Sequence, residues 1–134
     1  MRVQNVFGPV DIAVSGMRAQ GQHMEVISSN IANARTADAG QGQPYRRLET
    51  ILRTQAEGVS GVVVDEVVPD QSPMERIYDP GNPKADASGH ITMPNVHLPI
   101  EMMNLAVASR SYQANAAILK RYQQLVDTAL ELLR

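Results

Sequence analysis

The chain has 134 residues, a formal net charge of −2 and no cysteine. Its length fits one domain or two small ones, and its near-neutral charge argues against a nucleic-acid reader, which normally carries a basic patch. The absence of cysteine excludes disulfides, thiolate catalysis and cysteine-ligated metals. No stretch approaches the roughly 18 apolar residues of a membrane span, and the first residues lack the order of a secretory signal, so composition alone indicates a cytoplasmic protein.

The first predicted element is a helix over residues 9–34. Pro9 suits a first helical turn, and Asp11 lies near the positive end of the helix dipole. Gly16 and Gly21 each cost about 1 kcal/mol relative to alanine, so this helix requires a partner, and Gly21 would allow that partner to approach closely. Its expected seam has alternating spacings of four and three: Val10, Val14, Met17, Gly21, Met24, Ser28 and Ile31.

Residues 35–98 are predicted to form a loop-rich segment with a small β-hairpin or sheet. A polar loop is expected at 35–44 and a loop with two glycines at 55–61. The sequence Asp79-Pro80-Gly81 is typical of a turn; the acidic residues around it resemble a calcium-binding loop only loosely, because the EF-hand spacing is absent. The four short strands are expected at residues 45–54, 62–68, 74–78 and 90–93.

The longest predicted element is a helix over residues 99–134, which contain no glycine and only one proline, at the first position. As one helix it would be roughly 54 Å long, and a rod of that length cannot bury an apolar stripe against itself. The N-terminal helix is the available partner. The seam alternates spacings of three and four: Leu105, Ala108, Tyr112, Asn115, Leu119, Tyr122, Val126, Ala129 and Leu133, and is widened by Ile118, Leu125 and Leu132.

These elements predict a mainly α fold with a small β insert. Residues 1–34 and 99–134 are expected to form a discontinuous two-helix coiled-coil core domain, and residues 35–98 a β-rich, loop-rich outer segment. Both helices carry more apolar surface than one seam needs. The residues predicted to pack the helices and to serve assembly are Val10, Val14, Met17, Met24, Ile31, Leu105, Tyr112, Asn115, Ile118, Leu119, Tyr122, Leu125, Val126 and Leu133.

No set of side chains in the sequence favours an enzyme, so we predict no catalytic, cofactor-binding or metal-binding residue. His23, His90 and His97 fall in three separate segments without the ligand spacing of a metal site. Asp65 and Glu66 are adjacent on a predicted strand, so they point to opposite faces and cannot act as an acid/base pair. A small hydrolase built on the β-rich centre would also need a nucleophile–base pair, which the sequence does not offer.

Two terminal stretches resemble the shared motifs of bacterial flagellar axial proteins, the family of rod, hook and hook-associated subunits. One comprises Ser15-Gly16-Met17 with residues 28–36, and the other residues 108–115. Between them, residues 78–83 are similar to the signature of a proximal-rod member. Pro99 departs from the family pattern and leaves the start of the second helix open. The motif residues are Ser28, Asn30, Asn33, Asp79, Pro80, Gly81, Asn82 and Pro83.

The resemblance implies a structural subunit of the proximal rod of the flagellar basal body. In such proteins the terminal helices pair at the inner core of a hollow tube that transmits motor torque, and the central segment lies outside. The implied partners are copies of the chain, the rod proteins FlgB, FlgF and FlgG, the basal adaptor FliE and the membrane ring. The implied location is the periplasmic part of the basal body, reached through the flagellar type III export apparatus without a cleaved signal peptide.

The same heptads would also support a different protein, a cytosolic helical-hairpin adaptor or binding module. The sequence from Asp79 to Pro83 argues against that alternative, because an adaptor needs no such insert. Recovery from cytosol rather than from purified basal bodies would favour the adaptor.

Overall fold

The computed structural model describes residues 8–55 and 60–133; residues 1–7 of the predicted core domain, residues 56–59 of the predicted loop and Arg134 lie outside the described residues. The fold is mainly α with a small β insert, which confirms the predicted fold class. The strands form two separate antiparallel pairs, β1 with β2 and β3 with β4. The elements are α1 (Gly8–Ala32), β1 (Leu48–Thr54), β2 (Val62–Pro69), β3 (Glu75–Tyr78), β4 (His90–Met93) and α2 (Leu98–Glu131).

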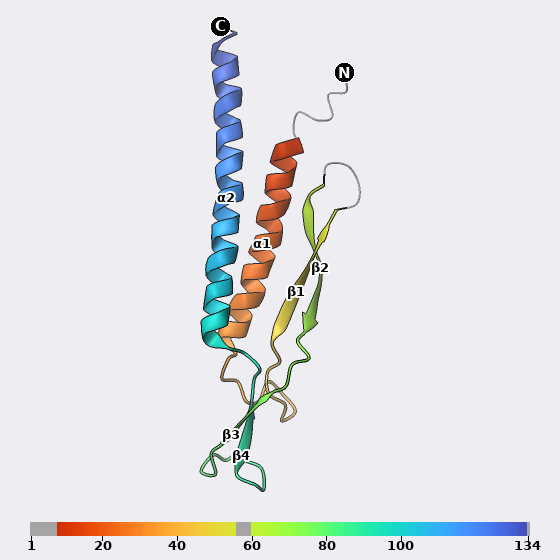
Figure 1. Cartoon of the computed structure of the whole chain (residues 1–134), viewed down its shortest axis with the longest axis vertical. Helices are drawn as coiled ribbons and strands as arrows, with labels where there is room; N and C mark the ends of the chain where they lie inside the picture. The colour runs from red at the N-terminus through yellow and green to blue at the C-terminus, as the bar shows by residue number, and fades with distance from the viewer. Residues whose placement is uncertain (1–7, 56–59, 134) are drawn as a thin grey trace.

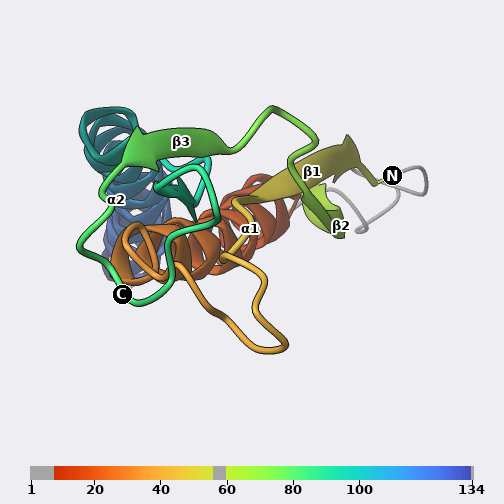
Figure 2. The ribbon, with the colours of Figure 1, turned by 90° about the horizontal axis from the view of Figure 1, so that it is seen from below.

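Helix α1 is the middle layer of the molecule. Figures 1 and 2 show α2 along one side of it and the β1–β2 hairpin along the other, and α1 contacts both. The β3–β4 hairpin lies beyond the lower end of the helices, and the C-terminal end of α2 extends past the start of α1 (Figure 1). α1 is therefore buried from two directions, whereas most of α2 has only one neighbour.

The two helices run antiparallel in one constant register. A Cβ built on Gly16 would lie 2.6 Å from Nδ2 of Asn115, and Asn30 lies within hydrogen-bonding distance of Glu101. The residue numbers of these facing pairs, 16 with 115 and 30 with 101, both add up to 131. The register therefore assigns to each position of α1 the position of α2 that lies opposite.

The buried face of α1 differs from the predicted seam by about one residue, or roughly 100° around the helix. None of the predicted seam residues of α1 is fully buried, and Ser28 is exposed. Gly21 has no atom within 4 Å of its Cβ position, so the glycine of close approach is Gly16. This face lies between α2 and the β1–β2 hairpin, and it consists of small and polar side chains. A prediction from apolar residues alone does not identify such a face. Its fully buried residues are Gly8, Ala13, Gly16, Ala19, Ile27 and Asn30.

The two glycines of α1 should respond to substitution with opposite signs. We expect Gly16→Val to lower the free energy of unfolding by about 1–3 kcal/mol, because the added methyl groups must displace the Asn115 side chain. Gly21→Ala is expected to raise it by about 0.5–1 kcal/mol, because the site is open and alanine favours the helix. Urea unfolding of the purified variants measures both, and shifts of the same sign would contradict the observed helix contact.

The β1–β2 hairpin is attached to α1 at the start of β2. The backbone N–H of Val62 donates to Oγ of Ser15 over 3.1 Å, and a Cβ on Gly61 would lie 2.5 Å from that oxygen. β1 begins at Leu48, three residues later than predicted, because the N–H groups of Arg47 and Leu48 donate to the side chains of Asn95 and Asn30. Side chains from outside the sheet thus hold the start of this strand.

Helix α2 begins at Leu98, with His97 as N-cap and Pro99 in the first turn. A proline is tolerated there because its missing N–H has no intrahelical partner in any case. The departure from the family pattern at Pro99 is therefore compatible with a regular helix start. Within the part of the chain that the structure describes, neither helix has an apolar window long enough to cross a membrane.

Candidate functional site: the polar joint and the exposed face of α2

Asn30 connects three elements from a fully buried position. Its Oδ1 accepts hydrogen bonds from the backbone N–H of Leu48 and the hydroxyl of Tyr45, both over 2.9 Å. Its Nδ2 donates to the carbonyl of Leu48 over 2.9 Å and to Oε2 of Glu101 over 3.2 Å. The side-chain amide thus binds both the N–H and the carbonyl of one residue of β1, and it also binds α2. All four of its hydrogen-bonding positions are used.

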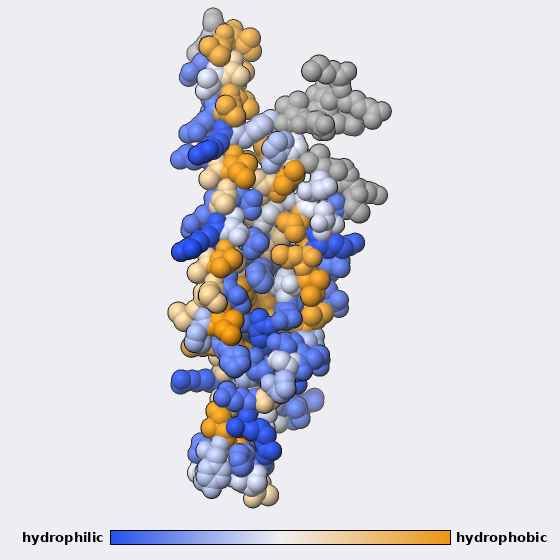
Figure 3. All heavy atoms as spheres, viewed as in Figure 1, coloured by the Kyte–Doolittle hydropathy of each residue, from blue (hydrophilic) through white to orange (hydrophobic). Residues whose placement is uncertain are grey.

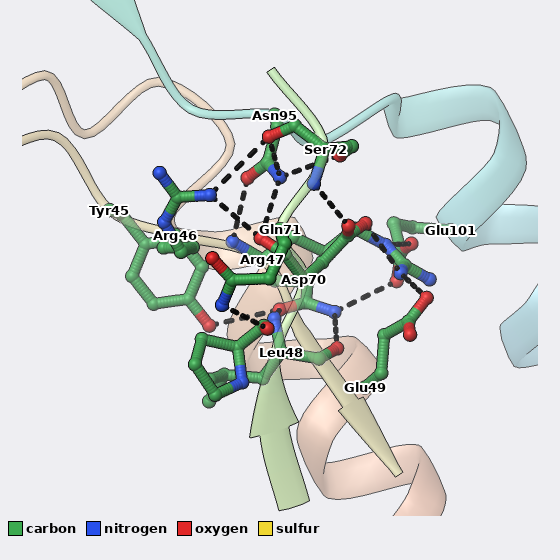
Figure 4. A network of polar contacts seen from close by, with 12 residues as sticks. Tyr45, Arg46, Arg47, Leu48, Glu49, Asp70, Gln71, Ser72, Asn95 and Glu101 are labelled. Carbon is green, nitrogen blue, oxygen red and sulfur yellow. Dashed lines mark hydrogen bonds and ion pairs between the residues drawn. The ribbon is translucent and has the colours of Figure 1, made fainter. Parts of the chain in front are cut away.

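Glu101 is 1% exposed, and Arg47 neutralises its charge. Nε of Arg47 donates to Oε1 of Glu101 over 2.7 Å, and its Nη1 reaches Asp70 and the exposed Glu49 (Figure 4). Burial alone would lower the pKa of Arg47, but its hydrogen bonds to Glu101, Glu49 and Asp70 raise the pKa above its ordinary value. The guanidinium is therefore a permanent charge that holds α2 against β1.

Asn95 extends this network to the linker before α2. Its Oδ1 accepts from the N–H of Arg47 over 2.9 Å, and its Nδ2 donates to Oγ of Ser72 over 2.8 Å (Figure 4). The N–H of Ser72 donates to Asp70 and lowers the pKa of that carboxyl. We call these five residues, Asn30, Arg47, Asp70, Asn95 and Glu101, the polar joint, because they connect α1, the hairpin and the start of α2.

His23 lies beside the polar joint and is half-buried. Its Nδ1 is buried and has no hydrogen-bond partner among the described residues. Burial lowers its pKa from the ordinary 6.5; Glu101 opposes that effect, and Arg47 adds to it. The folded chain therefore favours the neutral imidazole.

We expect His23 to make stability depend on pH in mildly acidic solution. The unfolded chain takes up this proton near pH 6.5 and the folded chain only at lower pH, so the stabilisation is complete above that value and is lost as the pH falls. His23→Gln should lose less of its free energy of unfolding between about pH 7.5 and about pH 5.5 than the unchanged chain does. The carboxyls with lowered pKa, such as Asp70, lose their contribution only below their ordinary value of 3.8, so they do not obscure this window. Urea unfolding at both pH values would measure the slopes, and equal slopes would count against the role of His23.

The terminal motif residues meet in the structure. Gly16, from the N-terminal motif, faces Asn115 from the C-terminal motif. Asn33 caps the end of α1: its Nδ2 donates to the carbonyl of Ser29, and its Oδ1 accepts from the hydroxyl of Thr36. Ser28 has a local contact only, donating to the carbonyl of Met24.

The central motif, Asp79 to Pro83, forms the tip of the β3–β4 hairpin. The N–H of Asn82 donates to the carbonyl of Asp79 over 3.1 Å, and Oδ1 of Asn82 accepts from the N–H of Lys84 over 3.1 Å. Pro80 packs close to Gly89, whose φ of +77° suits glycine. These are contacts of a rigid turn. Among the described residues, no three histidine or carboxylate side chains come together as metal ligands.

The predicted assembly residues divide by burial. Beyond Tyr122 the predicted residues are all exposed, because the C-terminal end of α2 extends past the start of α1 (Figure 1). Half-buried are Val10, Val14, Met17, Met24, Ile31, Leu105, Asn115, Leu119 and Tyr122. Exposed are Tyr112, Ile118, Leu125, Val126 and Leu133.

Helix α2 carries a second stripe of apolar side chains that are largely exposed. Leu125 is 69% exposed and Leu132 is 83% exposed. Figure 3 shows apolar side chains along α2 up to its C-terminal end. We call this set the outer stripe; its members, spaced mainly by three, four or seven, are Ile100, Met103, Val107, Ile118, Leu125 and Leu132.

Sequence reasoning found Asn30 only through its motif and did not find the other members of the polar joint. Glu101 and Arg47 are 54 residues apart in the chain, and each looks like an ordinary surface charge in its own segment. They come together only because the tertiary fold sets the start of β1 beside the start of α2. No local sequence pattern predicts that arrangement.

The sequence of this chain matches known protein families. The family described as "Flagella basal body rod protein" matches residues 11–38, and that described as "Flagellar basal body rod FlgEFG protein C-terminal" matches residues 87–132. The chain is 41% identical to "Flagellar basal-body rod protein FlgC" of Escherichia coli O6:H1, over 98% of either chain. Proteins of the same name from Salmonella typhimurium and Borreliella burgdorferi are 40% and 32% identical, over 98% and 96% of this chain and 98% of each relative. The similarity thus includes the β segment as well as both helices.

Proposed function

We propose that this chain, which belongs to the FlgC family of flagellar basal-body rod proteins, builds the proximal rod by helical polymerisation. As a member of that family it is a structural subunit of the rod. In this proposal, copies of the chain and other rod proteins form a hollow shaft that transmits motor torque. The role is structural rather than catalytic.

The outer stripe is the observation that carries the proposal. It is an apolar face, spaced mainly by three, four or seven residues, on a helix that α1 covers along a neighbouring face. A soluble monomer gains nothing from such a face, whereas a neighbouring helix would bury it. The stripe and the α1 surface differ, so contacts between them would be heterologous, and heterologous contacts that do not close generate helical assemblies.

The polar joint supports a role in transmitting torque. A buried carboxylate, a guanidinium and two hydrogen-bonded side-chain amides connect the helices to the hairpin, so these elements cannot slide without breaking several charge-assisted bonds. Such a joint would let torque applied to the helices reach the outer segment as a rotation of one rigid body. We propose accordingly that residues 1–34 and 99–134 form the core unit of the rod and residues 35–98 its outer part.

The chain associates with other rod components of the basal body. As the specific neighbours we propose FlgB, FlgF and FlgG, with FliE and the membrane ring at the base. We further propose that the chain reaches the periplasmic part of the basal body through the flagellar type III export apparatus, without a cleaved signal peptide.

Deletion and complementation would test the function. A strain that lacks the gene should build no rod beyond its base and should be non-motile, and the unchanged chain supplied in trans should restore both. The restored protein should co-purify with detergent-extracted basal bodies. Motile deletion cells, or a complementing protein found only in cytosol, would instead favour the helical-hairpin adaptor.

A further inference from the structure

We propose that Met103 is an oxidation site on the outer stripe, and that a peroxide which converts its thioether to the sulfoxide prevents the chain from joining the rod. The proposal rests on the proposed function, because it takes the outer stripe to be an assembly contact. It begins with two adjacent methionines near the start of α2, Met102 and Met103, which are 59% and 61% exposed.

These two thioethers are the most accessible ones among residues 8–55 and 60–133. The other methionines of those ranges are half-buried on α1 or in the strand segments between the helices. They are Met17, Met24, Met74 and Met93. An oxidant in solution reaches an exposed sulfur before a covered one. Met102 and Met103 are therefore the expected sites of first oxidation in the unassembled chain.

The two exposed methionines lie on different faces of α2. Successive residues of a helix are about 100° apart. Met103 lies on the outer stripe, three residues after Ile100 and four before Val107. Met102 lies outside the stripe, about 160° around the helix from Ile100. Only the oxidation of Met103 therefore changes the outer stripe, and Met102 offers a matched control at the adjacent position.

The modification is a two-electron transfer of one oxygen atom. With hydrogen peroxide, the sulfur of Met103 bonds to one oxygen while the O–O bond breaks, and the other oxygen leaves as water. The thioether is oxidised and the peroxide is reduced, and a flexible apolar side chain becomes a polar one. Water hydrates the sulfoxide in the free chain. Against an apolar neighbour in the rod, the sulfoxide oxygen would lose that water without gaining a hydrogen-bond donor.

Peptide mass mapping of the purified chain tests the site itself. The chain would be treated with dilute hydrogen peroxide, and the gain of one oxygen would be followed at each methionine. Met102 and Met103 should be oxidised at least about fivefold faster than Met17 and Met24, because exposure sets the access of the oxidant. A methionine sulfoxide reductase should then remove the added oxygen. Equal rates at all four positions would overturn the assignment.

Three variants in a strain that lacks the gene test the consequence for assembly. Met103→Gln imitates the polarity of the sulfoxide, whereas Met103→Leu stays apolar and cannot be oxidised. Met103→Gln should lower the number of rods per cell at least about tenfold, because its amide would be buried without a partner. Met103→Leu and the control Met102→Gln should leave that number unchanged. A normal number of rods with Met103→Gln would overturn the proposal, and so would an equal loss with Met102→Gln.

A charge elsewhere on the same stripe separates this proposal from the proposed function. Leu125→Asp disrupts the outer stripe without involving a methionine. Rods that form with Met103→Gln but not with Leu125→Asp would refute the oxidation site alone. Rods that form with both variants would also remove the outer stripe as an assembly contact.

Discussion

Replacing Leu125 with aspartate is expected to abolish rod assembly while the isolated chain stays folded. Leu125 is 69% exposed and belongs to the outer stripe, so the substitution removes little contact within one chain, and its effect on unfolding should stay within about 0.5 kcal/mol. In the assembled rod, a neighbour that covers the stripe would bury the new carboxylate without a partner, at a cost of several kcal/mol per subunit contact. Repeated along a polymer, that cost should prevent growth.

The measurement has two parts. Swimming in soft agar and electron microscopy of basal bodies report assembly in a deletion strain that carries the variant, and urea unfolding reports the fold of the purified chain. Gln124→Asp is the matched control, because it adds the same charge to the adjacent residue on the polar face of α2. Motile cells with Leu125→Asp would show that the outer stripe is not an assembly contact. A loss of motility with both variants would point to charge rather than position.

Much of the fold follows from local sequence patterns. The gap-free heptads after Pro99 predict a single long helix, and α2 runs from Leu98 to Glu131. The β-branched run from Val62 and the short segment from His90 predict strands that the structure contains within one residue. These predictions succeed because periodicity and turn chemistry act over a few residues, and neither requires knowledge of the neighbours.

The buried face of α1 did not follow from hydropathy, for a physical reason. A helix between two partners needs close approach on a wide face, so Ala13, Gly16 and Ala19 are buried there while larger residues such as Met17 and Met24 are displaced to the half-buried flank. A seam chosen from the large apolar residues therefore lies one residue away from the face of α1 that is buried. The signal that could have corrected it is the smallness of the residues spaced three apart, which favours tight helix packing.

The polar joint could not be predicted from the sequence for a different reason. Asn30 lies in the last turn of α1, where a polar residue is ordinary, so only its place in the family motif drew attention to it. Glu101 gives no such signal, because an acidic residue in the first turn of a helix is ordinary. Its burial arises from the position of β1 relative to α2, which depends on contacts far apart in the chain.

Replacing Glu101 with alanine is expected to be the most destabilising single change in the chain, at about 3 kcal/mol of the free energy of unfolding. The substitution removes the carboxylate that binds Nε of Arg47 and Nδ2 of Asn30, and it leaves a guanidinium only 18% exposed without its buried partner. Losing one member of a buried ion pair costs more than the pair itself contributes, because the remaining charge stays desolvated. Urea unfolding followed by circular dichroism measures the loss.

Glu49→Ala provides the comparison, because Glu49 binds the same guanidinium from a side chain that is 47% exposed. Its loss should cost less than about 1 kcal/mol, as is usual for a surface pair. Replacing both members of the buried pair, with Arg47→Met and Glu101→Leu, should recover part of the stability lost in Glu101→Ala, since no fully buried charge then remains without a partner and Asp70 keeps the hydrogen bond from the N–H of Ser72. Similar losses for Glu101→Ala and Glu49→Ala would show that burial does not set the strength of this contact. The polar joint would then not be the rigid link through which the helices could turn the outer segment.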